Sequence, residues 1–164
     1  MVFQTALGWV GVVSSAKGLR RLILPLTSRG EVLSAIGNSC LCVGGGISDL
    51  STDLPQRLQR YFSGERVDFR ARLDLSGATR FRQDVWEITR SIPYGQTRSY
   101  GWVAEQLGAP KATRAVGRAL GKNPLPVVIP CHRVVRSDGG LGGFSGGLEM
   151  KRLLLNLEKS YLSV

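Results

Sequence analysis

The sequence predicts a mixed α/β (α+β) fold divided into two units. An alternating apolar stretch around a glycine turn predicts an antiparallel β-hairpin near the N-terminus. Amphipathic segments with capping residues predict helices in the second half, and an apolar β-branched run at 125–135 predicts a buried strand among them. We therefore expect an N-terminal α/β domain at 1–65, a linker at 66–79 and a C-terminal domain at 80–164.

The chain carries a strong excess of positive charge. Its 164 residues include 22 Lys and Arg against 12 Asp and Glu, for a formal net charge of +10. This excess favours a polyanionic partner, nucleic acid before an anionic membrane surface, although basic residues can also serve solubility alone. No apolar run reaches transmembrane length, and residues 1–5 lack the positive start of a signal peptide, so a cytoplasmic location is expected.

The first half of the chain contains structural elements and no candidate chemistry. Residues 9–14 and 19–25 flank a short turn, in which Gly18 occupies a position that requires positive φ. Asp53 is the expected N-cap of a helix at 54–62 with one apolar face. That face comprises Leu54, Leu58 and Tyr61 or Phe62, and the helix is expected to end at Ser63 and Gly64.

Cys40 and Cys42 precede a run of glycines and leave more than one interpretation open. Their spacing does not match a usual zinc knuckle, and the one histidine lies far away in the sequence, so no metal site is expected. A strained disulfide between these neighbours and a pair of plain thiols remain, of which the thiols are the simpler interpretation. Three cysteines in a chain of 164 residues do not make a disulfide framework.

Two short helices in the second half have the arrangement of a helix-turn-helix. Ser99 is the expected cap of the first, and Pro110 opens the turn to the second at 111–121. Thr79 is the expected cap of a preceding helix. The apolar positions expected to face the core are Phe81, Val85, Ile88 and Ile92 in the preceding helix, Val103, Ala104 and Leu107 in the next, and Val116 and Leu120 in the last.

The helix at 111–121 has a basic stripe and a surface almost without side chains. Small residues permit close approach and cations favour phosphate, so this helix could press into a nucleic-acid groove. A solvated charged face is the alternative, but the helix-turn-helix arrangement and the net charge of +10 favour DNA. The stripe comprises Lys111, Arg114, Arg118 and Lys122, and the bare surface comprises Ala112, Ala115, Gly117 and Ala119.

The predicted strand at 125–135 carries the candidate nucleophile. Cys131 stands between Pro130 and His132, the only histidine of the chain. A thiolate rather than a thiol attacks, and a neighbouring base or cation lowers the thiol pKa from about 8.5 toward neutrality. Because side chains alternate along a strand, the two should point to opposite sides, so proton transfer needs a bridging water or a turn at Pro130. An inert core cysteine is the alternative.

A glycine-rich loop and a helix follow the predicted strand. The loop at 139–147 has no lysine and no Walker pattern, but it can bring backbone N–H groups close to a flat ligand. The helix at 148–159 carries Glu158 near its end, either as a solvated surface charge or as a partner that orients His132. Its inward positions are expected at Met150, Leu153, Leu154 and Leu157.

The segment Pro130-Cys-His-Arg-Val134 resembles the active-site signature of the O6-alkylguanine-DNA alkyltransferases, also called methylated-DNA–protein-cysteine methyltransferases. The resemblance runs without a gap from about residue 80 to 158, whereas the first half matches only as a strand hairpin followed by a helix. It implies an RNase H-like N-terminal domain and a winged helix-turn-helix-like C-terminal domain. The other matching segments are 99–100, 114–117, 121–124, the loop at Ser145, and 157–158.

The resemblance implies DNA repair in which an O6-alkylguanine is flipped out of duplex DNA and its alkyl group passes irreversibly to Cys131, once per protein molecule. His132 would take the thiol proton through a water, and Glu158 would orient His132. Asn123 would bridge the helix-turn-helix to the active-site strand. Tyr100 would help to rotate the nucleotide and would bind the flipped base.

The same resemblance places the small-residue helix in the minor groove, with Arg114 filling the gap left in the duplex. The carbonyl groups of Cys131 and Val134 would accept from the guanine amino group, and the backbone N–H of Ser145 would reach O6. The remaining residues implied to face DNA or the base are Ala112, Thr113, Ala115, Gly117, Phe144 and Gly146. The resemblance implies no cofactor, no metal and a monomer, and O4-alkylthymine is a second lesion to consider.

Three departures from the family pattern bear on function. Phe144 stands where many relatives carry tyrosine, which removes a hydroxyl that could help the leaving base. Arg118 stands where some relatives have a small residue, and the zinc ligands of some N-terminal domains are absent. Two other functions remain as alternatives: a DNA-binding regulator or lesion flagger without chemistry, and a cysteine hydrolase, which would not account for the basic helix.

Overall fold

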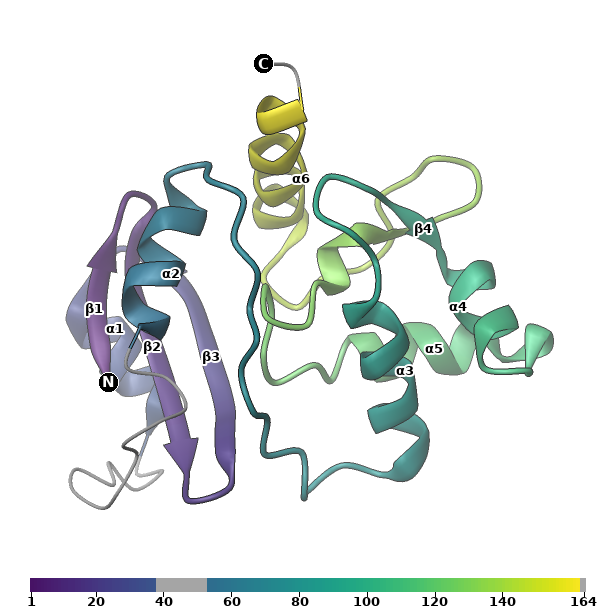
Figure 1. Cartoon of the computed structure of the whole chain (residues 1–164), viewed down its shortest axis with the longest axis horizontal. Helices are drawn as coiled ribbons and strands as arrows, with labels where there is room; N and C mark the ends of the chain where they lie inside the picture. The colour runs from purple at the N-terminus through teal and green to yellow at the C-terminus, as the bar shows by residue number, and fades with distance from the viewer. Residues whose placement is uncertain (38–52, 163–164) are drawn as a thin grey trace. The chain divides into compact units, whose positions relative to one another are not determined.

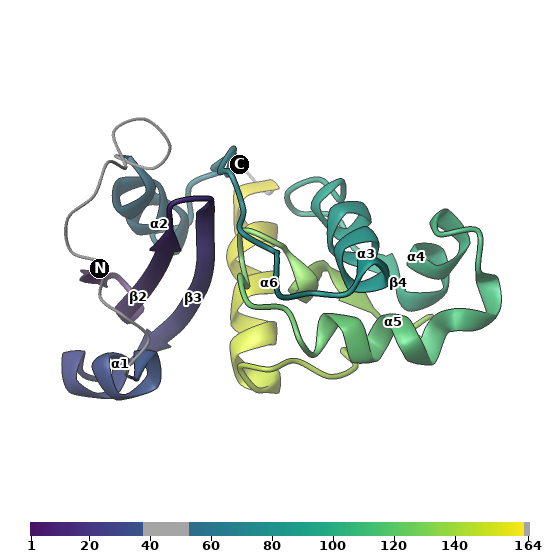
Figure 2. The same cartoon turned by 90° about the horizontal axis from the view of Figure 1, so that it is seen from below.

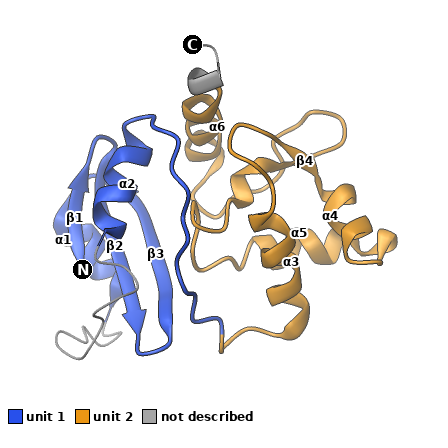
Figure 3. Ribbon diagram, in the orientation of Figure 1, with its two compact units in different colours: residues 1–75 blue, residues 76–164 orange. Residues whose placement is uncertain are grey.

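The computed structural model describes residues 1–37 and 53–162, with side chains as far as Lys159. It divides into two compact units, Met1–Leu75 and Ser76–Val164 (Figure 3). The division falls inside the segment 66–79 that the sequence predicts as a linker, while the domain boundaries themselves stay a prediction. The prediction for Cys40 and Cys42 lies outside the described residues.

The first unit contains a three-stranded antiparallel sheet in the order β1-β2-β3. β1 (Val2–Thr5) was not expected from the sequence, whereas β2 (Gly8–Ser15) and β3 (Gly18–Leu26) form the predicted hairpin. Gly18 has φ of 139°, so the expected positive φ is confirmed. The hairpin pairs Ser15 with Gly18 across a turn of two residues.

Two helices cover opposite faces of this sheet (Figures 1 and 2). α1 (Arg29–Ile36), which the sequence analysis did not predict, packs so closely on β2 that a Cβ at Gly11 would lie 2.5 Å from a Val32 methyl group. α2 (Leu54–Phe62) is the predicted helix, and its four predicted apolar residues are buried. Asp53 makes no side-chain cap, because its carboxylate pairs with Arg57 at 2.5 Å.

The second unit holds a helix-turn-helix. Its two helices, α4 (Tyr100–Gln106) and α5 (Thr113–Leu120), are joined by a turn that contains a 3₁₀ segment. The predicted caps are confirmed, since Thr79 Oγ1 accepts from Arg82 N and Ser99 Oγ accepts from Trp102 N. The elements are α3 (Arg80–Arg90), β4 (Arg98–Ser99), α4 (Tyr100–Gln106), η1 (Pro110–Ala112), α5 (Thr113–Leu120), η2 (Cys131–Arg133), β5 (Val134–Val135) and α6 (Leu148–Leu162).

Most of the positions predicted to face inward in and around α3, α4 and α5 are buried, with one clear exception. Phe81 is 37% exposed, because α3 turns Val85, Trp86 and Thr89 inward instead. The Trp86 indole donates to the Ala119 carbonyl over 3.0 Å and so ties α3 to α5. The predicted core residues Ile92, Val103, Ala104, Val116 and Leu120 are buried.

The predicted strand at 125–135 is buried but mostly not a strand. Ile129 N donates to Leu125 O and Cys131 N to Ile129 O, both over 2.8 Å, so the chain turns tightly before the cysteine. Val127 has φ of 75°, a left-handed conformation that a strand does not allow. Only β5 is extended, and it pairs in parallel with β4. The prediction was wrong because an apolar β-branched run marks burial and does not fix the backbone.

α6 buries a different face from the one predicted. Leu154 is buried as expected, but Leu153 is 38% exposed. The buried positions beside Leu154 are Leu155 and two charged residues, Lys151 and Glu158. Because these charges lie on the inward face, apolar spacing alone pointed to the wrong side of the helix.

Candidate active site

Cys131 begins the 3₁₀ turn η2 and lines a cavity of about 550 Å³. The residue is only 4% exposed. One side of the cavity is formed by α5, through Arg114, Gly117 and Arg118, and another by loop residues 142–145. A buried thiol is therefore reached through a cavity whose wall carries two exposed guanidinium groups.

Asn123 connects the end of the helix-turn-helix to the cysteine. Its Nδ2 donates to Ile129 O over 2.9 Å and to Cys131 Sγ over 3.0 Å, while its Oδ1 accepts from Leu125 N over 2.9 Å. Asn123 is itself buried. The side chain thus fixes the turn that delivers Cys131 and places an N–H donor on the sulfur.

Glu158 forms hydrogen bonds with two segments of the second unit, the turn η2 and the loop at Gly95. Its Oε1 lies 2.8 Å from His132 Nε2, and its Oε2 accepts from Gly95 N over 3.0 Å. Arg133 donates to both oxygens, and its other terminal nitrogen donates to Ile92 O over 2.7 Å. Glu158 is 1% exposed, so it is not the solvated surface charge of the alternative interpretation.

These contacts set the charge states of the pair. Burial alone would raise the pKa of the Glu158 carboxyl, but the hydrogen bonds and charges of His132 and Arg133 outweigh it and hold that pKa well below its usual range. Burial lowers the pKa of His132, although Glu158 opposes the shift. At neutral pH the site therefore contains a carboxylate and a neutral imidazole. Because a carboxylate only accepts, His132 carries its proton on Nε2, which leaves Nδ1 as the basic nitrogen.

The thiol of Cys131 is not pre-ionised. Burial raises its pKa, and the hydrogen bond from Asn123 and the positive charge of Lys151 oppose that rise only in part. The expectation of a lowered pKa is therefore wrong for the protein without DNA, because the cost of burial exceeds the help of the neighbouring groups. A base has to remove the proton during the reaction.

Tyr100 and the glycine-rich loop form another part of the cavity wall. Tyr100 Oη donates to Gly143 O over 3.4 Å, and a Cβ at Gly142 would lie 2.5 Å from that hydroxyl oxygen. Phe144 and Ser145 line the same cavity. Gly146 is exposed and does not line it. Glycine at 142 thus allows the backbone to touch the tyrosine.

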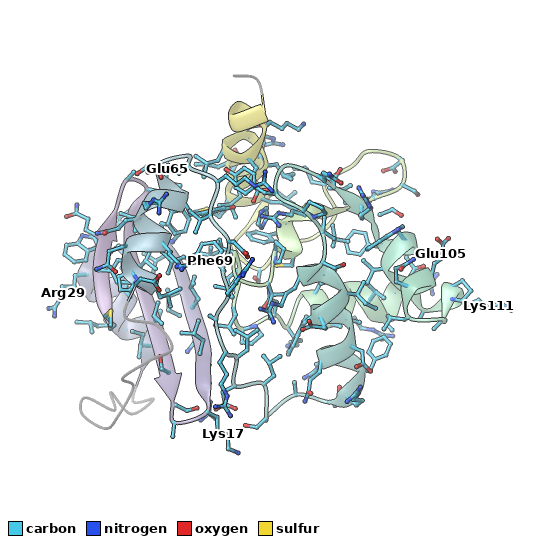
Figure 4. The ribbon with its side chains drawn as sticks, in the orientation of Figure 1. Lys17, Arg29, Glu65, Phe69, Glu105 and Lys111 are labelled. Atoms are coloured by element: carbon cyan, nitrogen blue, oxygen red, sulfur yellow. The ribbon has the colours of Figure 1, made fainter. Side chains whose placement is uncertain are left out.

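The predicted DNA-facing residues occupy η1 and α5. Lys111, Arg114 and Arg118 are exposed there, and Figure 4 shows Lys111 extending outward from η1. Ala112, Thr113 and Ala115 do not line the cavity, whereas Gly117 does. Val116, Ala119 and Leu120 form the buried side of the same helix. The surface around the cavity mouth is therefore basic and low in side-chain bulk.

Two buried residues of the site were not assigned a role from the sequence. Arg133 binds Glu158, and Lys151 donates to the carbonyl of Val134 over 2.6 Å. A carbonyl oxygen has two lone pairs, so Val134 can still accept from a base. One feature of the sequence could have revealed Lys151: it lies seven residues before Glu158, which puts the two on one helix face with Leu154.

The described part of the chain contains neither a cluster that could bind a metal ion nor a helix that could span a membrane. Across residues 1–37 and 53–162, no three His, Cys, Asp or Glu side chains gather in a way that could hold a metal ion. None of the helices in those ranges combines the length and the apolar character needed to cross a bilayer.

The residues of this site lie in a part of the chain that is similar to known proteins. Residues 80–160 match the family described as 6-O-methylguanine DNA methyltransferase, DNA binding domain. A methylated-DNA–protein-cysteine methyltransferase of Mycobacterium tuberculosis is 54% identical over 104 residues, which cover 63% of this chain and 62% of that relative. The alignment thus spans less than two thirds of that curated relative.

Solved structures are similar over nearly the full length. Mycobacterium tuberculosis OGT in complex with DNA is 38% identical with a TM-score of 0.74, covering 97% of this chain and 91% of that one. The O6-methylguanine-DNA methyltransferase of the archaeon Pyrococcus kodakaraensis is 30% identical with a TM-score of 0.69, covering 96% of each chain.

Proposed function

Because the chain belongs to the O6-alkylguanine-DNA alkyltransferase family, we propose that it repairs O6-alkylguanine in duplex DNA by moving the alkyl group to Cys131. The observation that carries the proposal is a buried thiol that lines a cavity beside the basic helix α5 and is followed directly in the chain by His132, whose imidazole pairs with the buried carboxylate of Glu158. The protein would act once, because the product is a thioether that water does not cleave.

The transfer needs one base and one leaving group. Nδ1 of His132, through a water, takes the proton of the Cys131 thiol, and Glu158 stabilises the imidazolium that forms. The thiolate sulfur then attacks the alkyl carbon in line with the O6–carbon bond. The S–C bond forms as the O6–carbon bond breaks, and the electron pair leaves with O6. The freed guanine takes up one proton, which balances the proton lost by the thiol.

DNA has to present the lesion to this cavity. A thiol that is 4% exposed cannot reach O6 of a stacked base, so the nucleotide must be flipped. Arg114 on α5 lines the cavity, and we propose that it fills the gap that the flipped nucleotide leaves in the duplex. The Ser145 N–H, the Val134 carbonyl and Tyr100 would bind the flipped base. Duplex DNA is therefore the proposed partner, met by a monomer.

The proposal includes a cytoplasmic location, where a free thiol is kept reduced. Among the described residues Cys131 is free and buried. Reduction matters because a disulfide or an oxidised sulfur could not accept an alkyl group.

A repair assay tests the proposal. A duplex with O6-methylguanine inside a restriction site, which blocks cleavage, is incubated with increasing protein and then digested. We expect cleavage to return in proportion to the protein added and to stop at one repaired site per chain, whereas Cys131→Ser should restore none. Repair by Cys131→Ser would favour a role without chemistry, and many repairs per chain would favour a hydrolase-like mechanism.

A further inference from the structure

Lys151 is fully buried on α6, where a charge is costly. Burial lowers the pKa of its ammonium group to about 8. An apolar side chain of similar length would fill the same space without the cost of burying a cation. Packing alone therefore does not account for a lysine at this position.

The ammonium group of Lys151 joins two segments that are separate in sequence. Its Nζ donates to Val134 O on β5 over 2.6 Å, to Gly143 O over 3.3 Å, and to Leu141 O. A lysine ammonium has three N–H donors, so the contacts use its full capacity. The glycine-rich loop at 139–147 is thereby tied to the strand that follows Cys131.

The same contacts include Tyr100 on α4. Lys151 Nζ lies 5.7 Å from the centre of the Tyr100 ring, and the Tyr100 hydroxyl shares the Gly143 carbonyl with it. Loop residues 142–145 line the cavity that holds Cys131. The lysine thus fixes one wall of the cavity from behind, without lining the cavity itself.

We propose that Lys151 is a positioning residue for alkyl transfer: its ammonium group holds the glycine-rich loop against β5 and Tyr100, so that the wall of the cavity is in place before DNA binds. The proposal rests on the alkyl-transfer function proposed above. A preformed wall places the Ser145 N–H and the Val134 carbonyl where the base needs them, without ordering the loop in each binding event.

The test uses Lys151→Met, which keeps the length of the side chain and removes its donors. Arg152→Met is the matched control, since it removes one positive charge from an exposed neighbour on α6. Three quantities are compared with the wild type: the rate of transfer from O6-methylguanine duplex, the affinity for that duplex, and hydrogen exchange of the loop amides at 141–145.

For Lys151→Met we expect transfer to be slower by about tenfold to a hundredfold, because small displacements of the groups that position a substrate cause losses of this size. Protection of the loop amides should fall, while duplex affinity and melting temperature stay near wild type, because a fully buried lysine cannot touch DNA. Arg152→Met should leave transfer and loop protection unchanged. A purely structural role would lower the melting temperature together with the rate.

Transfer at the wild-type rate by Lys151→Met, with or without a looser loop, would overturn the proposal. A wild-type protein that does not transfer the alkyl group would contradict the proposed function instead. Hydrogen exchange of the loop amides would then still test whether Lys151 holds the loop in place.

If Lys151→Met does not fold, the wild-type lysine can be titrated by carbon-13 NMR of its Cε. The other titratable groups near the ammonium are Cys131, His132 and Tyr100. Repeating the titration in Cys131→Ser removes the thiol. If the loop amides lose protection at the same pH as the Lys151 ammonium group deprotonates, the proposal is supported. If their protection does not change when Lys151 deprotonates, the proposal is overturned.

Discussion

His132 Nε2 and Glu158 Oε1 lie 2.8 Å apart, with side chains only 0% and 1% exposed. The pair connects η2, which carries the cysteine, to α6. Arg133 completes it with hydrogen bonds to the same carboxylate. The orientation of the base beside Cys131 therefore depends on a carboxylate that lies far from it in the sequence.

We expect Glu158→Gln to lower the free energy of unfolding by about 3–5 kcal/mol, because it leaves the buried Arg133 guanidinium without its anion. Urea denaturation followed by tryptophan fluorescence measures the change. Glu149→Gln is the control, since Glu149 pairs with Arg152 on the exposed side of the same helix and should matter little. Equal effects of the two substitutions would contradict a buried ion-pair network.

Stability should fall on mild acidification because of His132. Burial holds the pKa of the folded imidazole below its ordinary value of 6.5, so the unfolded chain binds a proton that the folded chain does not. The free energy of unfolding then decreases as pH drops below 6.5, with a slope of up to about 1.4 kcal/mol per pH unit. Since His132 is the only histidine, urea denaturation between pH 7 and 5 reports on it directly.

His132→Gln should remove that slope, and a wild-type stability that is flat over the same range would show that the folded imidazole protonates freely.

Below about pH 4.3 a further loss of stability is expected from Glu158. Its folded pKa is depressed, so the unfolded carboxyl takes up its proton first, and the stability held at higher pH is lost on acidification.

Asn123→Ala should make Cys131 harder to ionise. The hydrogen bond from Asn123 lowers the pKa of the thiol, so its loss should move the pH profile of Cys131 alkylation by a small reagent to higher pH. Peptide mapping by mass spectrometry isolates Cys131 from the other two cysteines. Asn156→Ala, an exposed asparagine on α6, is the control. An unshifted profile would mean that Asn123 positions the turn only.

Arg114 and Arg118 should contribute differently to DNA binding. Arg118→Ala should reduce the slope of log affinity against log salt by about 0.9, as expected for one lost phosphate contact. Arg114→Ala should weaken base flipping, measured with a fluorescent base next to the lesion, more than it weakens binding measured by anisotropy. An equal loss of flipping and binding in Arg114→Ala would contradict its role in filling the duplex.

Gly142→Ala should destabilise the loop and displace Tyr100. Gly142 has φ of 68°, and its added Cβ would lie 2.5 Å from the tyrosine hydroxyl. The left-handed conformation alone costs a non-glycine residue about 1–2 kcal/mol. Gly143→Ala is the control, since nothing lies within 4 Å of a Cβ there. Similar melting temperatures and transfer rates for the two variants would show that the loop adjusts freely.

The sequence predicted the elements whose local signals agree with their packing. The hairpin around Gly18 and the helices capped by Thr79 and Ser99 are such cases, because turn and cap chemistry is local. The residues of the site were predicted through a resemblance, and the structure brings Cys131 and Asn123 into contact.

The predictions failed where tertiary structure opposes the local pattern. α6 was assigned the wrong inward face because Lys151 and Glu158 are buried charges, satisfied by partners distant in sequence. The strand before Cys131 was wrong because tight turns replace it. The raised pKa of the thiol depends on burial, which spacing along the chain does not reveal.

The most direct test of the central claim is the mass of the intact protein after incubation with duplex DNA that contains O6-methylguanine, followed by peptide mapping. The account predicts a gain of one methyl group on Cys131 that saturates at one per chain, and no gain with unmodified duplex. Binding of the lesion duplex with no gain in mass would contradict alkyl transfer and leave the protein as a lesion-binding protein without chemistry.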